Sequence, residues 1–264
     1  MIKFKTGTIN YTDQGTGYVI VLLHGYLETL EIWSDFAKEL AKSFRVIAID
    51  IPGHGLSGKV SEIHTMDLMA EALNTVLKNL NIDKAVLVGH SMGGYVAMAY
   101  LANYKSKMSG LCLFHSNPFS DNDEKKANRD REIEIINQGK QYILFNTNVP
   151  KGFATDNLEY FKARVEWAKD IAANCKPDGI IALLEGLKIR PDRQKLLKET
   201  NIPILFIIGR KDNYIDFKTM FKLAGQSPEG KILVLDNSGH MGFIEESGIC
   251  AGALKSFAQK CFKP

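Results

Sequence analysis

Short apolar runs alternate with helical stretches along most of this chain. Six runs are rich in Val, Ile and Leu and almost continuous, which is typical of strands covered on both faces in a parallel sheet. They begin at Tyr18, Arg45, Lys84, Gly110, Ile202 and Lys231. The segment E-I-W-S-D-F-A-K-E-L-A instead places Ile32, Phe36 and Leu40 on one helix face. This alternation predicts a doubly wound α/β fold with a mostly parallel sheet.

Two segments depart from this rhythm. The opening I-N-Y-T-D-Q-G-T-G-Y-V predicts a hairpin of antiparallel edge strands around a Gly-rich turn. Residues 117–200 are helical and charged, and we interpret them as a helical cap inserted over the carboxyl edge of the sheet. Residues 1–116 and 201–264 would then form the core. A helical layer that merely extends the core is the alternative.

Charge and cysteine usage exclude several classes of function. The net charge is +3 and the lysines are scattered, so we expect no nucleic-acid partner. The cysteines, Cys112, Cys175, Cys250 and Cys261, have neither the spacing of a metal site nor that of a disulfide framework. Since no apolar segment resembles a signal peptide or a membrane span, we expect a cytoplasmic protein without a membrane partner. The sequence does not fix the oligomeric state.

One polar residue stands between two apolar elements in V-L-V-G-H-S-M-G-G-Y-V-A-M-A-Y. Ser91 lies in a G-x-S-x-G pattern that follows a predicted strand and precedes a predicted helix, the context of a nucleophile elbow. Gly89 and Gly93 fit such a tight turn, because side chains there would collide with neighbouring backbone. The pattern predicts that the Ser91 hydroxyl stands above the sheet edge as a nucleophile.

A serine nucleophile needs a base, and the base needs an orienting carboxylate. His240 follows the last strand in a Gly-containing loop, and we choose it as the base. Asp212 comes just after the preceding strand and is our choice for the acid, with Asp216 and Asp236 as competitors. For the other histidines we expect packing by His90, which neighbours Ser91, and we find no motif around His64 or His115. The order Ser91, Asp212, His240 is the nucleophile–acid–base order of this class.

The developing negative charge on a substrate oxygen needs preorganised donors. The backbone N–H of Met92, directly after the nucleophile, is one candidate. The backbone N–H of Tyr26 in H-G-Y-L-E is the second, since Gly25 lets that loop approach closely. These two amides are the predicted oxyanion hole.

With these residues in place, the chain resembles the α/β-hydrolase superfamily of the serine type. The matching motifs are L-L-H-G-Y, D-I-P-G-H-G-L-S, V-G-H-S-M-G-G, G-R-K-D and S-G-H-M-G-F-I-E, in the family's order from residue 22 to 245. The resemblance implies that Ser91, Asp212 and His240 form the triad and that His24 and His54 are structural or line the pocket. Relatives that open epoxides or displace halide use aspartate at the elbow, so Ser91 argues against those reactions.

The expected function is hydrolysis of a small to medium, largely apolar ester through an acyl-enzyme, without a metal or organic cofactor. Cleavage of a carbon–carbon bond, lactone hydrolysis and cofactor-free perhydrolysis are alternatives on the same triad. A ligand receptor with slow turnover is the alternative of another class. We expect the pocket for this small-molecule substrate to be lined by His24, Leu27, Phe145, Phe153, Trp167, Leu184 and Met241.

Overall fold

A central sheet of seven strands organises the computed structural model, which describes residues 1–262. In spatial order the strands are β3 (Tyr11–Gln14), β5 (Arg45–Ile49), β4 (Val19–Leu23), β6 (Ala85–His90), β7 (Met108–Phe114), β8 (Ile204–Gly209) and β9 (Gly230–Leu235). All neighbours pair in parallel except β3, which is antiparallel to β5. The mostly parallel sheet predicted from the six apolar runs is therefore confirmed.

The N-terminal hairpin was predicted with the wrong partner. β3 does not fold back on β4, because both edges of β4 are occupied by parallel neighbours, β5 and β6. The chain instead passes over the Gly15–Gly17 turn and leaves β3 paired with β5 at the sheet edge. A separate two-stranded ribbon, β1 (Ile2–Phe4) with β2 (Gly7–Ile9), precedes it.

Helices cover both faces of the sheet, and each strand contributes alternate side chains to the two sides. In β4, Val21 and Leu23 pack in one apolar cluster, and Ile20 and Leu22 in the other. The first cluster includes α2 (Met66–Asn79), α3 (Met92–Tyr104) and α9 (Phe217–Ala224). The second includes α1 (Ser34–Ala41) and α11 (Ser247–Phe262). Short helices η1 (Leu30–Trp33), η2 (Lys105–Lys107) and α10 (Gly242–Glu245) join these elements.

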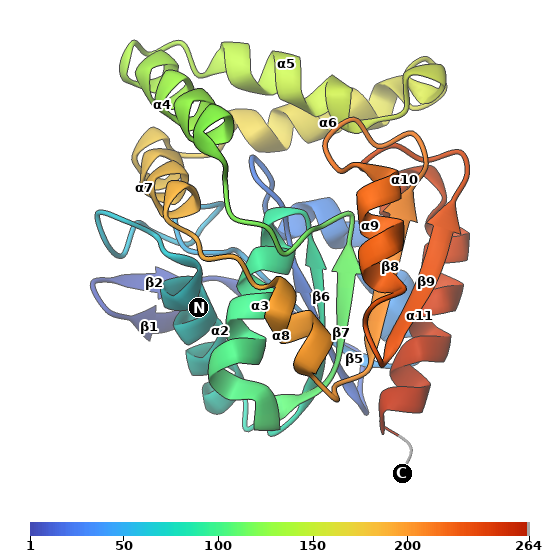
Figure 1. Ribbon diagram of the computed structural model, residues 1–264. Helices are drawn as coiled ribbons and strands as arrows, with labels where there is room; N and C mark the ends of the chain where they lie inside the picture. Colours follow the sequence, from blue (N-terminus) through green and yellow to red (C-terminus); the bar gives the residue numbers. More distant parts are fainter. Residues whose placement is uncertain (263–264) are drawn as a thin grey trace.

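A helical layer lies across the carboxyl ends of the strands (Figure 1). It consists of α4 (Asp123–Asn137), α5 (Tyr142–Gly152), η3 (Thr155–Asn157), α6 (Lys162–Ala173) and α7 (Pro177–Lys188). The following α8 (Gln194–Glu199) lies lower, in front of α3 in the view of Figure 1. Asp121 lies in the segment that enters this layer, and Arg190 lies in the segment that leaves it. The two form a buried ion pair, with 2.8 Å between Arg190 Nη1 and Asp121 Oδ1. The inserted helical cap is thus present, and its bounds of 117–200 stay a prediction.

Loops at the carboxyl edge carry the residues singled out from the sequence. Tyr26 follows β4, Ser91 follows β6, Asp212 follows β8 and His240 follows β9. In a parallel sheet these strand ends meet at one edge, so four segments far apart in sequence converge beneath the cap. No helix within residues 1–262 has the length and apolar character needed to cross a membrane.

Candidate active site

Ser91 lies on a strained turn between β6 and α3. Its φ is 50° and its ψ is −115°, a conformation that side-chain-bearing residues rarely adopt. A Cβ at Gly89 would overlap the backbone of Gly93 and Gly94, and a Cβ at Gly93 would overlap the carbonyl of Leu23. Only glycine therefore allows the strand, the turn and the helix to approach so closely, and the turn holds Ser91 at the pocket surface.

Two other non-glycine residues near the site share a positive φ. Leu27, in the loop after β4, has φ 58°, and His115, directly after β7, has φ 48°. Each such residue costs on the order of 1–3 kcal/mol and persists only where its surroundings hold it. Together with Ser91 they lie after three neighbouring strands, β4, β6 and β7, at the edge of the sheet that carries the candidate site.

Asp212 and His240 are in direct contact. His240 Nδ1 lies 2.8 Å from Asp212 Oδ2, and His115 Nδ1 lies 3.1 Å from the same oxygen. The other carboxylate oxygen, Oδ1, accepts the backbone N–H groups of Tyr214 (2.8 Å) and Ile215 (3.0 Å). With Nδ1 bound to Asp212, His240 is left with Nε2 as the nitrogen available to a nucleophile.

The hydrogen bonds around Asp212 keep it ionised although it is buried. Burial alone would raise the pKa of this carboxyl group, but the neighbouring His240 and the hydrogen bonds from His115 and His240 hold its pKa well below the usual range. Burial conversely lowers the pKa of His115 to about 4, so this imidazole is neutral and serves as a donor. Asp212 is therefore a fixed negative charge facing His240.

The two competing acids are engaged elsewhere. Asp236 is exposed and pairs with Arg210, whose Nε lies 2.7 Å from its carboxylate. Asp216 caps the N-terminus of α9 by accepting the backbone N–H of Thr219 at 2.8 Å. Of the three candidates, the structure brings only Asp212 to His240.

His115, Asp212 and His240 also form a group with metal-ligand chemistry, since one atom of each lies within 4.8 Å of the others. We interpret the group as hydrogen-bonded, because the two nitrogen–oxygen distances of 2.8 and 3.1 Å are those of direct hydrogen bonds.

The loop after β4 approaches the elbow closely. His24 is buried and accepts the backbone N–H of Ile51 at Nε2 (3.0 Å), so its Nδ1–H donates to the carbonyl of Gly25 (2.9 Å). This fixes the start of the loop, and Tyr26 follows as part of the pocket wall. Met92 is the first residue of α3, where N–H groups have no partner within the helix. Both amides predicted as the oxyanion hole thus belong to segments that flank Ser91.

A buried pair, Glu28 and His90, ties together the loops around Ser91. Glu28 Oε2 accepts the backbone N–H of Gly25 (2.5 Å) and lies 3.0 Å from His90 Nδ1. His90 Nε2 lies 2.9 Å from the carbonyl of His240. Since a carboxylate and a carbonyl only accept, both imidazole nitrogens donate, which requires an imidazolium. His90 is buried, as expected for a packing residue, but it is also charged. Its two N–H groups link the loop of Gly25, through Glu28, to the loop of His240.

The pKa directions agree with this ion pair. Burial alone would lower the pKa of His90, but the Glu28 carboxylate raises it above 6.5. Burial alone would raise the pKa of Glu28, but the charge and hydrogen bond of His90 lower it below 4.5. The pair is therefore charged between these two values, although both groups are removed from water.

Replacing Glu28 by Gln should destabilise the fold by about 3 kcal/mol, since breaking a buried pair leaves its partner uncompensated. A glutamine oxygen in the place of Oε2 would accept the N–H groups of Gly25 and of His90 Nδ1. The neutral His90 would then have no proton on Nε2 to donate to the carbonyl of His240. A glutamine N–H₂ in that place would face the N–H of Gly25. Urea unfolding measures the change, and Glu31→Gln, an exposed neighbour, is the control.

The pH dependence of this change has a defined sign. The contribution of Glu28 is present above about pH 4.5 and is lost as pH falls through its lowered pKa. The contribution of His90 is present below about pH 6.5 and is lost as pH rises through its raised pKa. The difference in the free energy of unfolding between wild type and Glu28→Gln should be largest between about pH 4.5 and pH 6.5. Equal stability of the two proteins there would contradict the ion pair.

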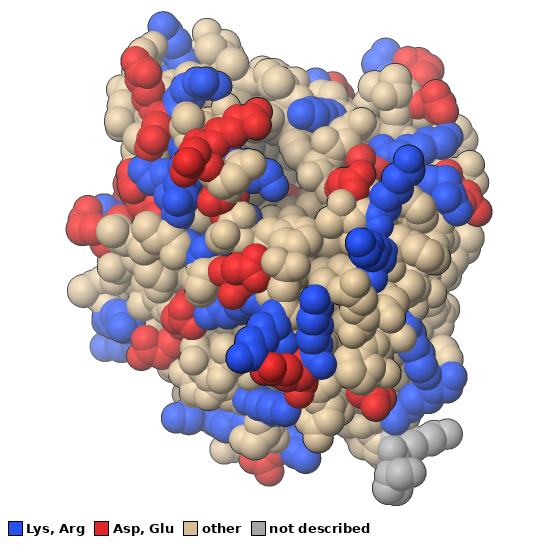
Figure 2. All heavy atoms as spheres, viewed as in Figure 1, with Lys and Arg blue, Asp and Glu red and all other residues tan. Residues whose placement is uncertain are grey.

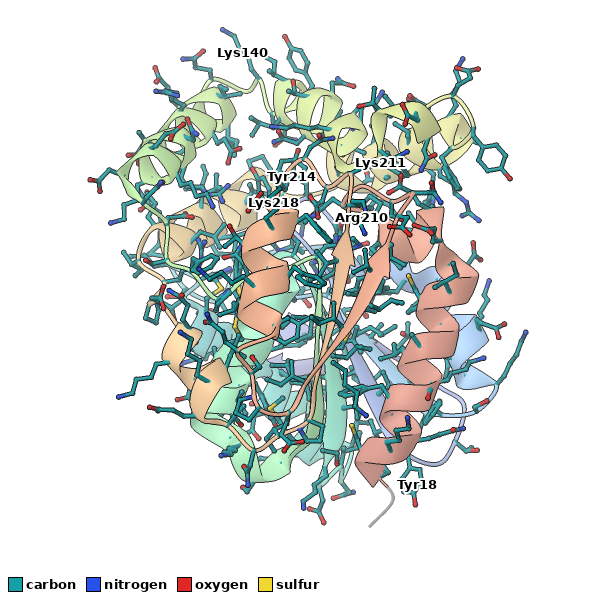
Figure 3. All side chains as sticks on the ribbon, turned by 45° about the vertical axis from the view of Figure 1, so that its right-hand side comes forward. Tyr18, Lys140, Arg210, Lys211, Tyr214 and Lys218 are labelled. Carbon is teal, nitrogen blue, oxygen red and sulfur yellow. The ribbon has the colours of Figure 1, made fainter. Side chains whose placement is uncertain are left out.

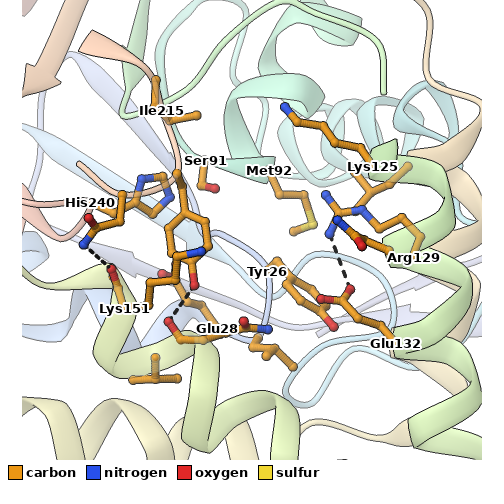
Figure 4. Close-up of a pocket in the computed structure, with 18 of the residues that line it drawn as sticks. Tyr26, Glu28, Ser91, Met92, Lys125, Arg129, Glu132, Lys151, Ile215 and His240 are labelled. Carbon is orange, nitrogen blue, oxygen red and sulfur yellow. Dashed lines mark hydrogen bonds and ion pairs between the residues drawn. The ribbon is translucent and has the colours of Figure 1, made fainter. Parts of the chain in front are cut away.

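A pocket of about 580 Å³ lies between the carboxyl edge of the sheet and the cap. Figure 2 shows this face of the molecule hollowed beneath the upper helices, with basic and acidic side chains around the hollow. Ser91 and His240 lie on one side of the pocket, and Arg129 and Glu132 of α4 lie on the opposite side (Figure 4). The volume is that of a small-molecule site.

The predicted apolar lining is largely wrong. Of the residues named from the sequence, Leu27 and Met241 line the pocket, whereas His24, Phe145, Phe153, Trp167 and Leu184 do not. Phe153 and Leu184 are buried in the apolar clusters, and Phe145 and Trp167 pack against those clusters. The cap uses these side chains to attach itself to the core.

Charged and polar side chains of the cap line the pocket together with the apolar residues Ile135, Val149, Ala168 and Leu187. The charged and polar ones come from α4, from the two residues before it and from the end of α5: Asp121, Asn122, Glu124, Lys125, Asn128, Arg129, Arg131, Glu132, Asn148 and Lys151. Lys125, Arg129 and Glu132 recur at the spacing of one helix face, which is the signal that sequence reasoning missed.

Tyr214 connects the loop of Asp212 to the cap and was also missed. It lies between the core and the upper helices (Figure 3), and its hydroxyl donates to the carbonyl of Asn148 in α5 at 2.8 Å. Its backbone N–H binds Asp212, and the ammonium of Lys151 lies 5.0 Å from its ring centre. No sequence motif marks such a contact, because it depends on where α5 lies.

The family model described as alpha/beta hydrolase fold matches residues 18–247. The chain belongs to the alpha/beta hydrolase family. This alpha/beta hydrolase is 28% identical over 254 residues to the AB hydrolase superfamily protein YisY of Bacillus subtilis (strain 168), covering 90% of this chain and 91% of that one. It is 27% identical to the pimeloyl-[acyl-carrier protein] methyl ester esterase of Vibrio atlanticus (strain LGP32), covering 96% and 99% of the two chains.

Among solved structures, a thermophilic esterase from Thermogutta terrifontis, determined with malate bound, superposes on this alpha/beta hydrolase with a TM-score of 0.94. The two chains are 28% identical, and the match covers 97% of this chain and 95% of the other. The match over nearly the whole of both chains includes the cap as well as the sheet.

Proposed function

We propose that this alpha/beta hydrolase is a serine esterase acting on small to medium esters. The observation that carries the proposal is the contact of His240 Nδ1 with the buried, ionised Asp212, in a pocket that also contains Ser91 on its strained turn. The esterases from Vibrio atlanticus and Thermogutta terrifontis support the same reaction class.

In the proposed mechanism, Ser91 Oγ attacks the ester carbonyl while His240 Nε2 takes the hydroxyl proton. Asp212 keeps the proton of His240 on Nδ1 and stabilises the imidazolium that forms. The amides of Tyr26 and Met92 bind the oxyanion, and His240 then protonates the leaving alcohol. Water attacks the acyl-enzyme with His240 as base, which releases the acid and restores Ser91.

Hydrolysis of p-nitrophenyl esters from acetate to octanoate tests this proposal. We expect steady turnover with a maximum at short to medium acyl chains, because a long apolar acyl chain would have to lie against the charged side chains of α4 that line the pocket. Carbon–carbon cleavage, lactone hydrolysis and perhydrolysis remain alternatives on the same residues and would be recognised by their products. A burst of p-nitrophenol without turnover would contradict the esterase proposal and favour a receptor.

A further inference from the structure

The pocket wall opposite Ser91 is built from one charged face of α4. Lys125, Arg129 and Glu132 follow each other at helical spacing and all line the pocket. Figure 4 shows the Lys125 side chain extending above Met92 toward the Ser91 side, with Arg129 below it in this view. A substrate whose ester lies at Ser91 would therefore extend toward a polar wall.

Two of the three acidic groups of this wall, Asp121 and Glu132, already have guanidinium partners, whereas Glu124 has no ion pair within residues 1–262. Asp121 is bound by the buried Arg190 at 2.8 Å and lies 3.4 Å from Arg129 Nε. Glu132 lies 3.4 Å from Arg129 Nη1. Burial is the main influence on Glu132 and raises its pKa, against the opposing effect of Arg129. The carboxyl groups of Asp121 and Glu132 are thus paired with the guanidinium groups of Arg129 and Arg190, and Lys125 takes no part in these pairs.

Lys125 adds a positive charge to this wall, and the carboxylates of Asp121 and Glu124 act on it electrostatically without forming an ion pair. It makes no ion pair with any residue in 1–262, and it lies at the pocket rim with part of its surface open to solvent. Partial burial lowers its pKa, while Asp121 opposes that effect. Arg129 also has N–H groups available to a ligand, because a guanidinium has five N–H donors and both of its ion-pair distances are long, at 3.4 Å.

We propose that the substrate carries a carboxylate in addition to its ester, and that Lys125 together with the free N–H groups of Arg129 binds this carboxylate. An ammonium beside a planar guanidinium suits a carboxylate, which accepts charge-assisted hydrogen bonds from both. The inference rests on the proposed esterase activity for the ester but not for the anion site. It replaces the largely apolar substrate expected from the sequence.

The test compares kcat/KM for p-nitrophenyl butyrate with that for mono-p-nitrophenyl glutarate, which places a carboxylate on the acyl side. A third ester, 4-(butyryloxy)benzoate, places it on the leaving-group side. Wild type should prefer one of the charged esters over the neutral one by about tenfold, the effect of one charge-assisted contact. The preference should shrink as salt is added, because the site is open to solvent.

Lys125→Glu should lower the ratio of charged to neutral ester at least tenfold, whereas Lys126→Glu should leave the ratio unchanged. Lys126 is the matched control because it is exposed on the same helix and does not line the pocket. Hydrolysis of the neutral ester without any preference for a charged one, or equal ratios in the two variants, would overturn the carboxylate site and leave the esterase proposal standing.

Calorimetric titration with glutarate makes the result independent of turnover. We expect wild type and Lys126→Glu to bind glutarate, and Lys125→Glu to bind it at least tenfold more weakly. If no ester is hydrolysed but this binding pattern holds, the esterase proposal fails and the carboxylate site stands. Absence of glutarate binding by folded wild type would overturn the site.

Discussion

Asp212→Asn is expected to lower kcat for ester hydrolysis about 10,000-fold, as for loss of the carboxylate in comparable triads. The amide has the same shape as the carboxylate, but it cannot accept all four of the hydrogen bonds that Asp212 receives. In one orientation the N–H₂ group faces the backbone N–H groups of Tyr214 and Ile215, which disrupts the loop that positions residue 212. In the other orientation the N–H₂ group donates to Nδ1 of His240, so the proton of this imidazole moves to Nε2. His240 then no longer accepts the proton of Ser91.

Asp236→Asn is the matched control for this prediction. Asp236 is an exposed acid four residues from His240, and its contact is a surface pair with Arg210. Exposed pairs contribute about 0–1 kcal/mol, so activity and stability should stay close to wild type. A larger loss of kcat in Asp236→Asn than in Asp212→Asn would assign the acid to the other residue.

Ser91→Ala should have the largest effect, a fall in kcat of about a million-fold, because it removes the nucleophile on which the whole mechanism depends. Alanine tolerates the strained φ of 50° no worse than serine does, so the turn and the thermal stability should be retained. Steady-state hydrolysis of a short p-nitrophenyl ester measures the loss.

Ser227→Ala provides the control for loss of a serine hydroxyl. Ser227 is buried, and its Oγ has no hydrogen-bond partner among residues 1–262, so the substitution removes no interaction. Full activity in Ser227→Ala together with near-wild-type turnover in Ser91→Ala would show that the nucleophile is elsewhere.

The sheet and the convergence of the site were predictable because they follow from chain order. Strands rich in Val, Ile and Leu pair in parallel, and their carboxyl ends meet at one edge. Residues placed directly after strands, such as Ser91, Asp212 and His240, are thus assembled by the fold itself. Gly89 and Gly93, which permit close backbone contact on either side of Ser91, predicted the tight turn at this position from the sequence as well.

The pocket wall was not predictable, because it depends on how one helix is rotated. Along α4 only Ile136 is buried, so no apolar stripe fixes which face turns inward. Arg129 and Glu132 face the pocket in a helix whose orientation depends on tertiary contacts, such as the ion pairs of Asp121 at its start, that local patterns do not encode. Apolar residues such as Trp167 suggested a lining but serve to attach the cap.

Glu28 and His115 illustrate a second limit. Both are buried polar residues whose partners, His90 and Asp212, are more than 60 positions away in the chain. A glutamate in a loop after a strand reads as an exposed charge unless the fold places a histidine against it. Buried ion pairs of this kind become visible only in three dimensions.

Covalent labelling with a fluorophosphonate, followed by mass spectrometry of the intact and digested protein, tests directly whether Ser91 is an activated nucleophile. We expect one adduct per chain on the peptide containing Ser91, formed much more slowly in Asp212→Asn and absent in Ser91→Ala. Labelling of another residue, or no adduct on folded wild-type protein, would contradict the assignment of Ser91 as an activated nucleophile.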